Sequence, residues 1–333
     1  MNLITGGKII KLLIIFGIII VFIAGIIIYF YFTNINPSSE PWEDKGTTRF
    51  DLDGKLFLTL QPNSYASKKG IYSFNFADRQ LRSFLTDNKY DNLTASFSDD
   101  NSKIVFISYR NGGIGQVFVA DADGKNIKQI TVSETIRKQL PVFSPNGKII
   151  AFTVFPSDVK TFLPEDQKIY ITDLDGNERF LTNGAHPMFL PGDKFVLVLK
   201  NDGLYMVSVE NGVSSVVIKG GSAFTTMKLA FSKNRNMLVW TNFPNEVLIF
   251  KLSWDSSSGY LNHFLYKKIL AGAFWAVFSP DGRYLAIQEA KNGNPPARAR
   301  IVVYDLKTFE WEEIIDLGSY KQTAMWMTAW QSR

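Results

Sequence analysis

A six-residue motif that recurs along the chain constrains the fold more than any other feature. Its fullest copies are Phe278-Ser279-Pro280-Asp281-Gly282-Arg283 and Phe143-Ser144-Pro145-Asn146-Gly147-Lys148, and weaker copies begin at Phe50, Phe97, Phe189 and Phe231. The copies lie roughly 40 to 47 residues apart, a period typical of propeller blades or of helical arrays. Short runs rich in Ile, Val, Phe and Tyr follow the turns, and such runs predict strands instead of helices. We therefore expect an all-β chain built as a β-propeller.

Each repeat predicts four strands. A first strand ends at the motif aromatic residue, a tight turn and a second strand follow, and an Asp/Gly-type turn such as residues 121–124 joins the third strand to the fourth. Residues 323–331 align with a first strand, and Trp330 takes the place of Phe278. A lone C-terminal strand of this kind is expected to complete the blade begun at the other end of the propeller. Six blades are predicted, with seven as the alternative.

The N-terminal segment predicts a membrane anchor. Residues 12–32 carry no charge, and at about 1.5 Å per residue they are long enough to cross a bilayer core of roughly 30 Å. Lys8 and Lys11 precede this run, so the positive-inside rule places the N-terminus in the cytoplasm. We expect a cytoplasmic tip at residues 1–8, a single-pass signal anchor at 9–32, a linker at 33–46 and an extracytoplasmic, periplasmic propeller at 47–333 in the cytoplasmic (inner) membrane.

The repeat resembles the Pro-Asp repeat of TolB-type six-bladed propellers. Phe-Ser-Pro-Asp-Gly followed by a strand, then Ile169-Tyr170-Ile171-Thr172-Asp173-Leu174-Asp175-Gly176-Asn177 and a closing Leu181-Thr182, carries the resemblance, which covers most of residues 47–331. It is strong in units two, three and six and degenerate in units four and five. TolB itself is a soluble periplasmic protein with a separate N-terminal domain, whereas this chain has a predicted anchor in that place. The resemblance implies a binding scaffold of the cell envelope without naming its partner.

Composition and motifs narrow the classes of function. The chain has no cysteine, so disulfides, thiolate metal sites and cysteine nucleophiles are excluded. The net charge of +5 is too weak and scattered to predict nucleic-acid binding. The two histidines, His186 and His263, have no Cys or clustered acids near them in sequence, so no metal site is predicted. No nucleophile elbow or phosphate-binding loop occurs, and we predict neither a cofactor nor a catalytic residue.

One face of the propeller is predicted to carry its binding site. The longer loops, at residues 61–70, 109–115, 155–167 and 289–300, all join second to third strands and so share the face on which the first strands begin. We call this the loop-rich face, and the opposite one the tight-turn face. Residues three to five positions before each motif aromatic residue should ring the opening of the central channel there, which we call the channel mouth. The candidate partner-binding residues are Asn92, Lys138, His186, Met227, Lys228, Phe274, Trp275 and Trp326. Aromatic and Met side chains with a few cations suit an adaptable, slightly basic pocket, although the aromatic residues are equally compatible with packing alone.

Three functions are consistent with this pattern. The first is a non-enzymatic, membrane-anchored scaffold that binds an envelope protein or peptide through the loop-rich face and the channel mouth. The second is a glycan-binding or polysaccharide-lyase-type propeller, with Trp275 and Trp326 as stacking platforms and acids such as Glu134 and Glu289. The third is an accessory propeller subunit of an envelope peptidase. The sequence does not distinguish oligomeric states.

Overall fold

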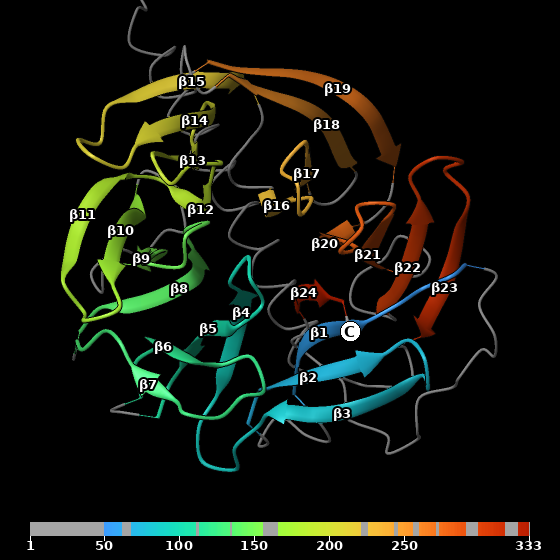
Figure 1. The fold of residues 1–333 in the computed structure, drawn as a ribbon, viewed down its shortest axis with the longest axis horizontal. Helices are drawn as coiled ribbons and strands as arrows, with labels where there is room; N and C mark the ends of the chain where they lie inside the picture. Colours follow the sequence, from blue (N-terminus) through green and yellow to red (C-terminus); the bar gives the residue numbers. More distant parts are fainter. Residues whose placement is uncertain are drawn as a thin grey trace, which may run out of the picture.

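The computed structural model describes residues 50–61, 68–110, 113–133, 135–155, 166–220, 226–242, 246–255, 260–270, 273–290, 299–316 and 326–332. These residues form six four-stranded antiparallel sheets arranged as blades around a central axis (Figure 1). The propeller is therefore six-bladed, as the repeat predicted, and the seven-bladed alternative is wrong. The predicted anchor and linker, residues 9–46, lie outside the described residues. Among those described, no helix is long and apolar enough to span a membrane.

The strands follow the chain blade by blade, innermost first. In this order they are β24 (Trp326–Gln331), β1 (Lys55–Leu60), β2 (Gly70–Asn75) and β3 (Gln80–Leu85) in blade 1; β4 (Asn92–Phe97), β5 (Lys103–Ser108), β6 (Gln116–Asp121) and β7 (Lys128–Gln129) in blade 2; β8 (Arg137–Phe143), β9 (Ile149–Phe155), β10 (Lys168–Asp173) and β11 (Glu178–Asn183) in blade 3; β12 (Ala185–Phe189), β13 (Phe195–Lys200), β14 (Gly203–Ser208) and β15 (Ser214–Lys219) in blade 4; β16 (Thr226–Phe231), β17 (Met237–Asn242), β18 (Glu246–Asp255) and β19 (Tyr260–Leu270) in blade 5; and β20 (Ala273–Phe278), β21 (Tyr284–Ala290), β22 (Ala299–Asp305) and β23 (Trp311–Asp316) in blade 6.

The ring is closed by the C-terminal strand. β24 pairs antiparallel with β1, so the two ends of the propeller share one sheet, and Figure 1 shows β24 beside β1. Trp330 Nε1 donates a hydrogen bond to the Asp53 carbonyl at 2.8 Å, and its ring stacks on Phe76 with centroids 4.7 Å apart. The predicted closing strand is thus confirmed. Phe50, which begins the first motif copy, packs against Tyr284 instead of ending a first strand, because β24 supplies that strand.

The core lies between the blades. The buried residues form six hydrophobic clusters, and each cluster joins two neighbouring blades. Trp240 of β17, for example, lies in the cluster between blades 4 and 5 and is 1 % exposed. Neighbouring blades cover both faces of each second strand. Its sequence is therefore a continuous apolar run, as in Lys103–Ser108, and does not alternate between apolar and polar residues.

The recurrent motif builds the turn between first and second strands. In four blades its serine donates a hydrogen bond to the Asp or Asn two positions later and accepts one from the backbone N–H five positions later; the serines are Ser98, Ser144, Ser232 and Ser279. The residue that follows the Asp or Asn has a positive φ, which Gly147 and Gly282 adopt without steric cost. The motif therefore recurs because one serine side chain and one residue at positive φ complete a tight turn, and that residue is Asn101 in blade 2 and Arg235 in blade 5.

Candidate functional site

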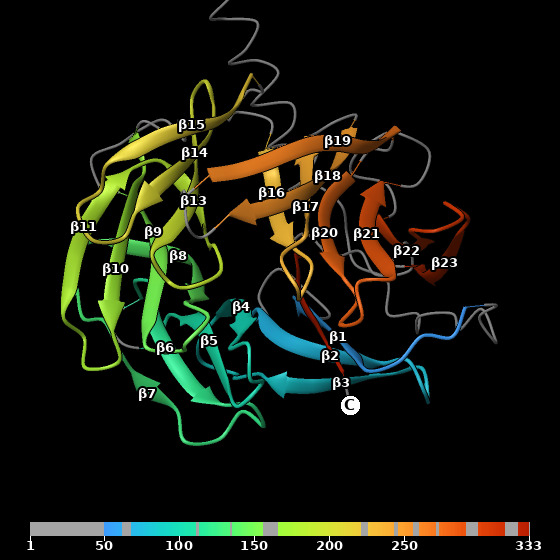
Figure 2. The same cartoon turned by 45° about the horizontal axis from the view of Figure 1, so that its top comes forward.

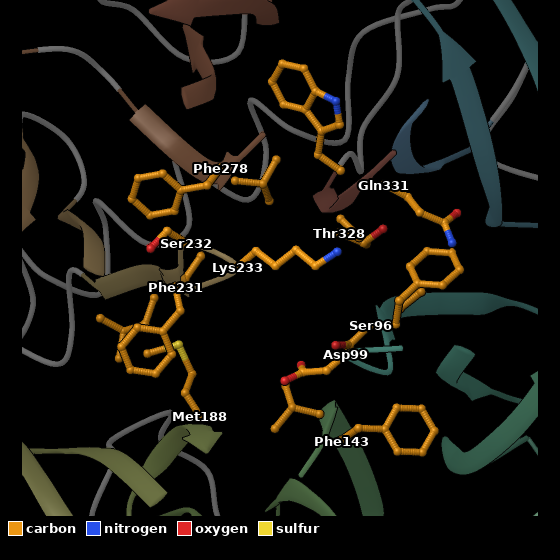
Figure 3. Close-up of a pocket in the computed structure, with 18 of the residues that line it drawn as sticks. Ser96, Asp99, Phe143, Met188, Phe231, Ser232, Lys233, Phe278, Thr328 and Gln331 are labelled. Carbon is orange, nitrogen blue, oxygen red and sulfur yellow. The ribbon is translucent and has the colours of Figure 1, made fainter. Parts of the chain in front are cut away.

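A cavity of about 240 Å³ runs along the central axis of the propeller. The innermost strand of every blade contributes to its wall: β4, β8, β12, β16, β20 and β24. Figure 3 shows side chains around one open space, among them Ser96, Asp99, Lys233 and Thr328, while the rings of Phe143 and Phe278 point away from it into the cores between blades. The cavity is the central channel that the repeat predicted, and it is the candidate binding site.

Each innermost strand is distorted where it lines the channel. All six show a one-residue register shift against the second strand, as in a β-bulge. In blades 2, 3 and 4 the shift places a residue that is not glycine at positive φ: Thr94 at 39°, Leu140 at 51° and His186 at 53°. This conformation costs a residue with a side chain roughly 1–2 kcal/mol. Bulges of this kind redirect side chains, and here all three residues line the channel.

The channel mouth combines apolar, aromatic and basic groups. Lys228 places its ammonium 5.1 Å from the centroid of the Trp275 ring, a cation–π contact. Burial lowers the pKa of Lys228 to about 8. Burial, and secondarily the neighbouring Lys228, lowers the pKa of His186 to about 3. At neutral pH this part of the wall therefore holds a neutral imidazole beside a desolvated cation.

An ion pair crosses the channel at the tight-turn face. Arg235, on the turn after β16, binds both carboxylate oxygens of Asp99, on the turn after β4, at 2.5 and 2.8 Å. Its Nε also donates a hydrogen bond to the Phe189 carbonyl at 3.2 Å. Lys233, on the same turn as Arg235, extends into the open space of the channel (Figure 3). The turns of the tight-turn face thus form one end of the cavity wall.

The eight predicted partner-binding residues do not all reach this cavity. His186, Lys228 and Trp275 line it. Phe274 is half-buried, and its carbonyl accepts a hydrogen bond from Thr241 Oγ1 at 3.2 Å. The side chains of Met227 and Trp326 lie outside the described residues, as do most of the predicted long loops. No finding tests whether any of the eight binds a partner.

Asn92 and Lys138 are buried away from the channel. Asn92 is 1 % exposed and donates to the Leu85 carbonyl. The Lys138 ammonium lies 3.1 Å from Gln116 Oε1 and 3.2 Å from Glu178 Oε1. Burial lowers the pKa of Lys138, and Glu178 opposes that shift. Both side chains form their polar contacts within the propeller.

The sequence pattern placed the candidate site at the channel mouth, so it did not predict a role for Lys233, Arg235 or Asp99. A signal was present, since the fifth motif copy has Lys233-Asn234-Arg235 where the sixth has Pro280-Asp281-Gly282. That departure replaces the turn glycine by a long cation at a φ of 53°.

The acids named for a lyase-type site are not arranged for catalysis in the described part of the chain. Glu289 is 5 % exposed and lies 2.5 Å from Arg300, which also binds Glu313 at 3.2 Å. Burial raises the pKa of Glu289, and the Arg300 charge opposes the shift. Glu134 is outside the described residues. Across the described residues, no group of three His, Cys, Asp or Glu side chains is placed to hold a metal ion.

Known structures share this architecture. TolB from Acinetobacter baumannii aligns with a TM-score of 0.61 at 16 % identity, covering 83 % of this chain and 67 % of its own. The chain has a TolB-like β-propeller fold. A putative TolB from Agrobacterium tumefaciens aligns with a TM-score of 0.53 at 12 % identity, covering 80 % of this chain and 90 % of its own.

Enzymes are also found among similar structures. An oligogalacturonate lyase in complex with manganese has a TM-score of 0.54 at 11 % identity, covering 84 % of this chain and 86 % of its own. No family model matches the chain, and no curated protein matches it. The structural alignments establish the TolB-like fold. At identities this low they do not establish a function, which has to be argued from the site.

Proposed function

We propose that this protein is a non-enzymatic scaffold of the cell envelope, held in the cytoplasmic membrane by residues 12–32, with its propeller on the outer side. It binds a protein or peptide partner through the loop-rich face and the channel mouth. The observation that carries the proposal is the channel itself: a cavity lined by all six blades, bridged by Arg235 and Asp99 at the tight-turn face, with Lys228 and Trp275 toward the loop-rich face.

The chemistry of the described lining residues supports binding over catalysis. Among them the single carboxylate is Asp99, and it is held by Arg235. The single imidazole, His186, has a pKa of about 3 and stays neutral near pH 7, where a general acid–base catalyst needs a pKa close to the working pH. The lyase-type alternative has less support, because Glu289 is committed to Arg300.

Site-specific photo-crosslinking in native membranes tests the proposal. A benzophenone amino acid replaces Leu140, a channel-lining residue of blade 3, or Phe180, an exposed residue on the outer strand of the same blade. We expect one envelope protein to crosslink at position 140 and not at position 180. Capture of the same proteins at both positions, or of none at position 140, would remove the support for partner binding at the channel.

A further inference from the structure

The channel carries positive charge that the described residues do not neutralise. Its charged lining residues are Asp99, Lys228, Lys233 and Arg235. Asp99 and Arg235 neutralise each other through their two short contacts. No described carboxylate forms an ion pair with Lys228 or Lys233. The remaining charge of the channel wall is therefore two lysines, both in blade 5.

The two lysines are separated along the channel. Lys228 lies within β16, and Lys233 lies on the turn after that strand, five residues further on. At about 3.3 Å per strand residue their backbones are at most about 16 Å apart, and the turn after Phe231 shortens that distance. Lys228 contacts Trp275, whereas Lys233 extends into the open space (Figure 3). An anionic ligand that meets both lysines is therefore elongated and bears more than one negative charge.

Burial makes the Lys228 charge the more consequential of the two. Removal from water disfavours its charged form, which is why its pKa falls to about 8. In most molecules Lys228 still carries its proton at neutral pH. The channel therefore holds a cation in surroundings of reduced dielectric constant. A carboxylate placed beside it gains more than the same contact at an exposed surface.

The walls between the lysines favour a peptide over a sugar. Leu140 and Phe231 are half-buried and contribute apolar surface to the channel wall, whereas Phe143, Met188 and Phe278 pack mainly into the cores between blades. Every innermost strand also has a sheet neighbour on one side only, so its other edge faces the channel. Backbone groups along such an edge can pair with an extended peptide, while apolar side chains accommodate its apolar residues. The cavity of about 240 Å³ admits a short extended segment and excludes a folded domain.

We propose that the channel binds a short, extended acidic peptide segment, with Lys228 and Lys233 pairing with its carboxylates. The proposal rests on the partner-binding function above and specifies the chemistry of that partner. Lys233 is exposed at the tight-turn face and Lys228 lies further along β16, so the segment runs along the channel between them. The Lys228 contact with Trp275 holds the ammonium in place before the ligand arrives.

Binding of two peptide pools to the full-length protein in nanodiscs of uncharged lipid tests this. Both pools contain biotinylated heptapeptides of mixed aliphatic and aromatic residues; one has glutamate at two fixed positions and the other has glutamine there. We expect the glutamate pool to bind at least tenfold more tightly, and Lys228→Gln combined with Lys233→Gln to remove that preference. Lys307→Gln, at an exposed lysine of the blade 6 hairpin, is the matched control and should retain it.

Each other outcome overturns the acidic-peptide proposal. Equal binding of both pools, undiminished binding to the double variant, or binding of oligogalacturonate in place of the peptides would each do so. Urea midpoints of the variants show whether a loss of binding reflects unfolding. If neither pool binds but position 140 still crosslinks to one envelope protein, the acidic specificity fails and the scaffold function stands. If crosslinking also fails, the scaffold function fails with it.

Discussion

Arg235 and Asp99 form an ion pair between blades that face each other across the propeller. Asp99 follows β4 in blade 2 and Arg235 follows β16 in blade 5, and the order of blade contacts around the ring places these two blades opposite each other. Figure 2 gives a tilted view of the ring, in which β4 and β16 belong to separate sides of it. The arginine occupies the turn position that is glycine in the sixth motif copy, so the pair is made at a conformational cost.

The two members of this pair are expected to respond differently to substitution. Arg235→Gly loses the ion pair but relieves a positive φ that costs roughly 1–2 kcal/mol with a side chain. Asp99→Asn loses the carboxylate charge and leaves Arg235 at its positive φ. We therefore expect Asp99→Asn to lower the free energy of unfolding by about 1 kcal/mol more than Arg235→Gly. Urea denaturation of both variants measures the difference.

Gly282 provides the matched control for the backbone part of that argument. It has a φ of 73°, and a Cβ added there would meet its nearest described neighbour, Ser232, at 3.9 Å, so the space is free. Gly282→Ala should then cost about 1 kcal/mol from conformation alone. A neutral Gly282→Ala, or an Asp99→Asn variant more stable than Arg235→Gly, would contradict the account of the turn.

Lys138 and Glu178 are expected to contribute to stability as a buried pair. Lys138 is 3 % exposed at its side chain, and Glu178 is 25 % exposed. Glu178→Gln leaves the ammonium without its charge partner and should cost about 1–3 kcal/mol. Lys138→Met removes the buried ammonium, which then no longer requires a charge partner. The double variant Lys138→Met with Glu178→Gln should therefore be more stable than Glu178→Gln alone. Chemical denaturation checks this, and a double variant less stable than Glu178→Gln alone would contradict it.

The sequence predicted the blades because each blade repeats one local solution. The serine turn, the residue at positive φ after it and the buried second strand are close together in the sequence. Their order and spacing therefore recur in each repeat and can be recognised there. Closure was predictable for the same reason, since Trp330 matches the aromatic position of the motif. Physical features that stay within one blade can be read from one repeat.

The side chains that face the channel were less predictable. Each innermost strand contains a one-residue register shift, and a shift of one residue sends every following side chain to the other face. Lys138 was therefore expected at the channel mouth but lies within the propeller, where it binds Glu178. The Arg235–Asp99 pair joins residues 136 positions apart, and no spacing rule connects them. Features formed between blades require the three-dimensional arrangement.

Trp330 is expected to determine whether the ring stays closed. It is 8 % exposed, stacks on Phe76 and donates to the Asp53 carbonyl. Trp330→Ala should cost about 3–5 kcal/mol, because it leaves a cavity and frees the β24 edge. Trp330→Phe keeps the stacking and loses one hydrogen bond, at a cost of about 1 kcal/mol. Thermal unfolding of both measures the order, and equal losses would show that the ring surface contributes nothing beyond the hydrogen bond.

His186 should make stability depend on pH in acid. Its folded pKa of about 3 lies below the ordinary value of 6.5, so the unfolded chain binds a proton first as pH falls. Stability is then full above pH 6.5 and is lost progressively as pH falls toward 3. His186→Asn, a residue that also tolerates positive φ, removes this term. Between pH 7 and 4.5 the wild type should lose about 2–3 kcal/mol more than the variant in urea titrations. Parallel pH curves would contradict the assigned protonation.

The predicted topology can be tested because the chain has no cysteine of its own. A single cysteine is placed at Lys307→Cys, on an exposed hairpin turn of blade 6, or at Lys8→Cys, in the predicted cytoplasmic tip. If residues 12–32 anchor the chain with the propeller outside, a membrane-impermeant maleimide added to intact spheroplasts labels position 307 and reaches position 8 only after lysis. The anchor prediction fails if position 307 is protected until lysis, because the positive-inside rule would then have assigned the wrong side.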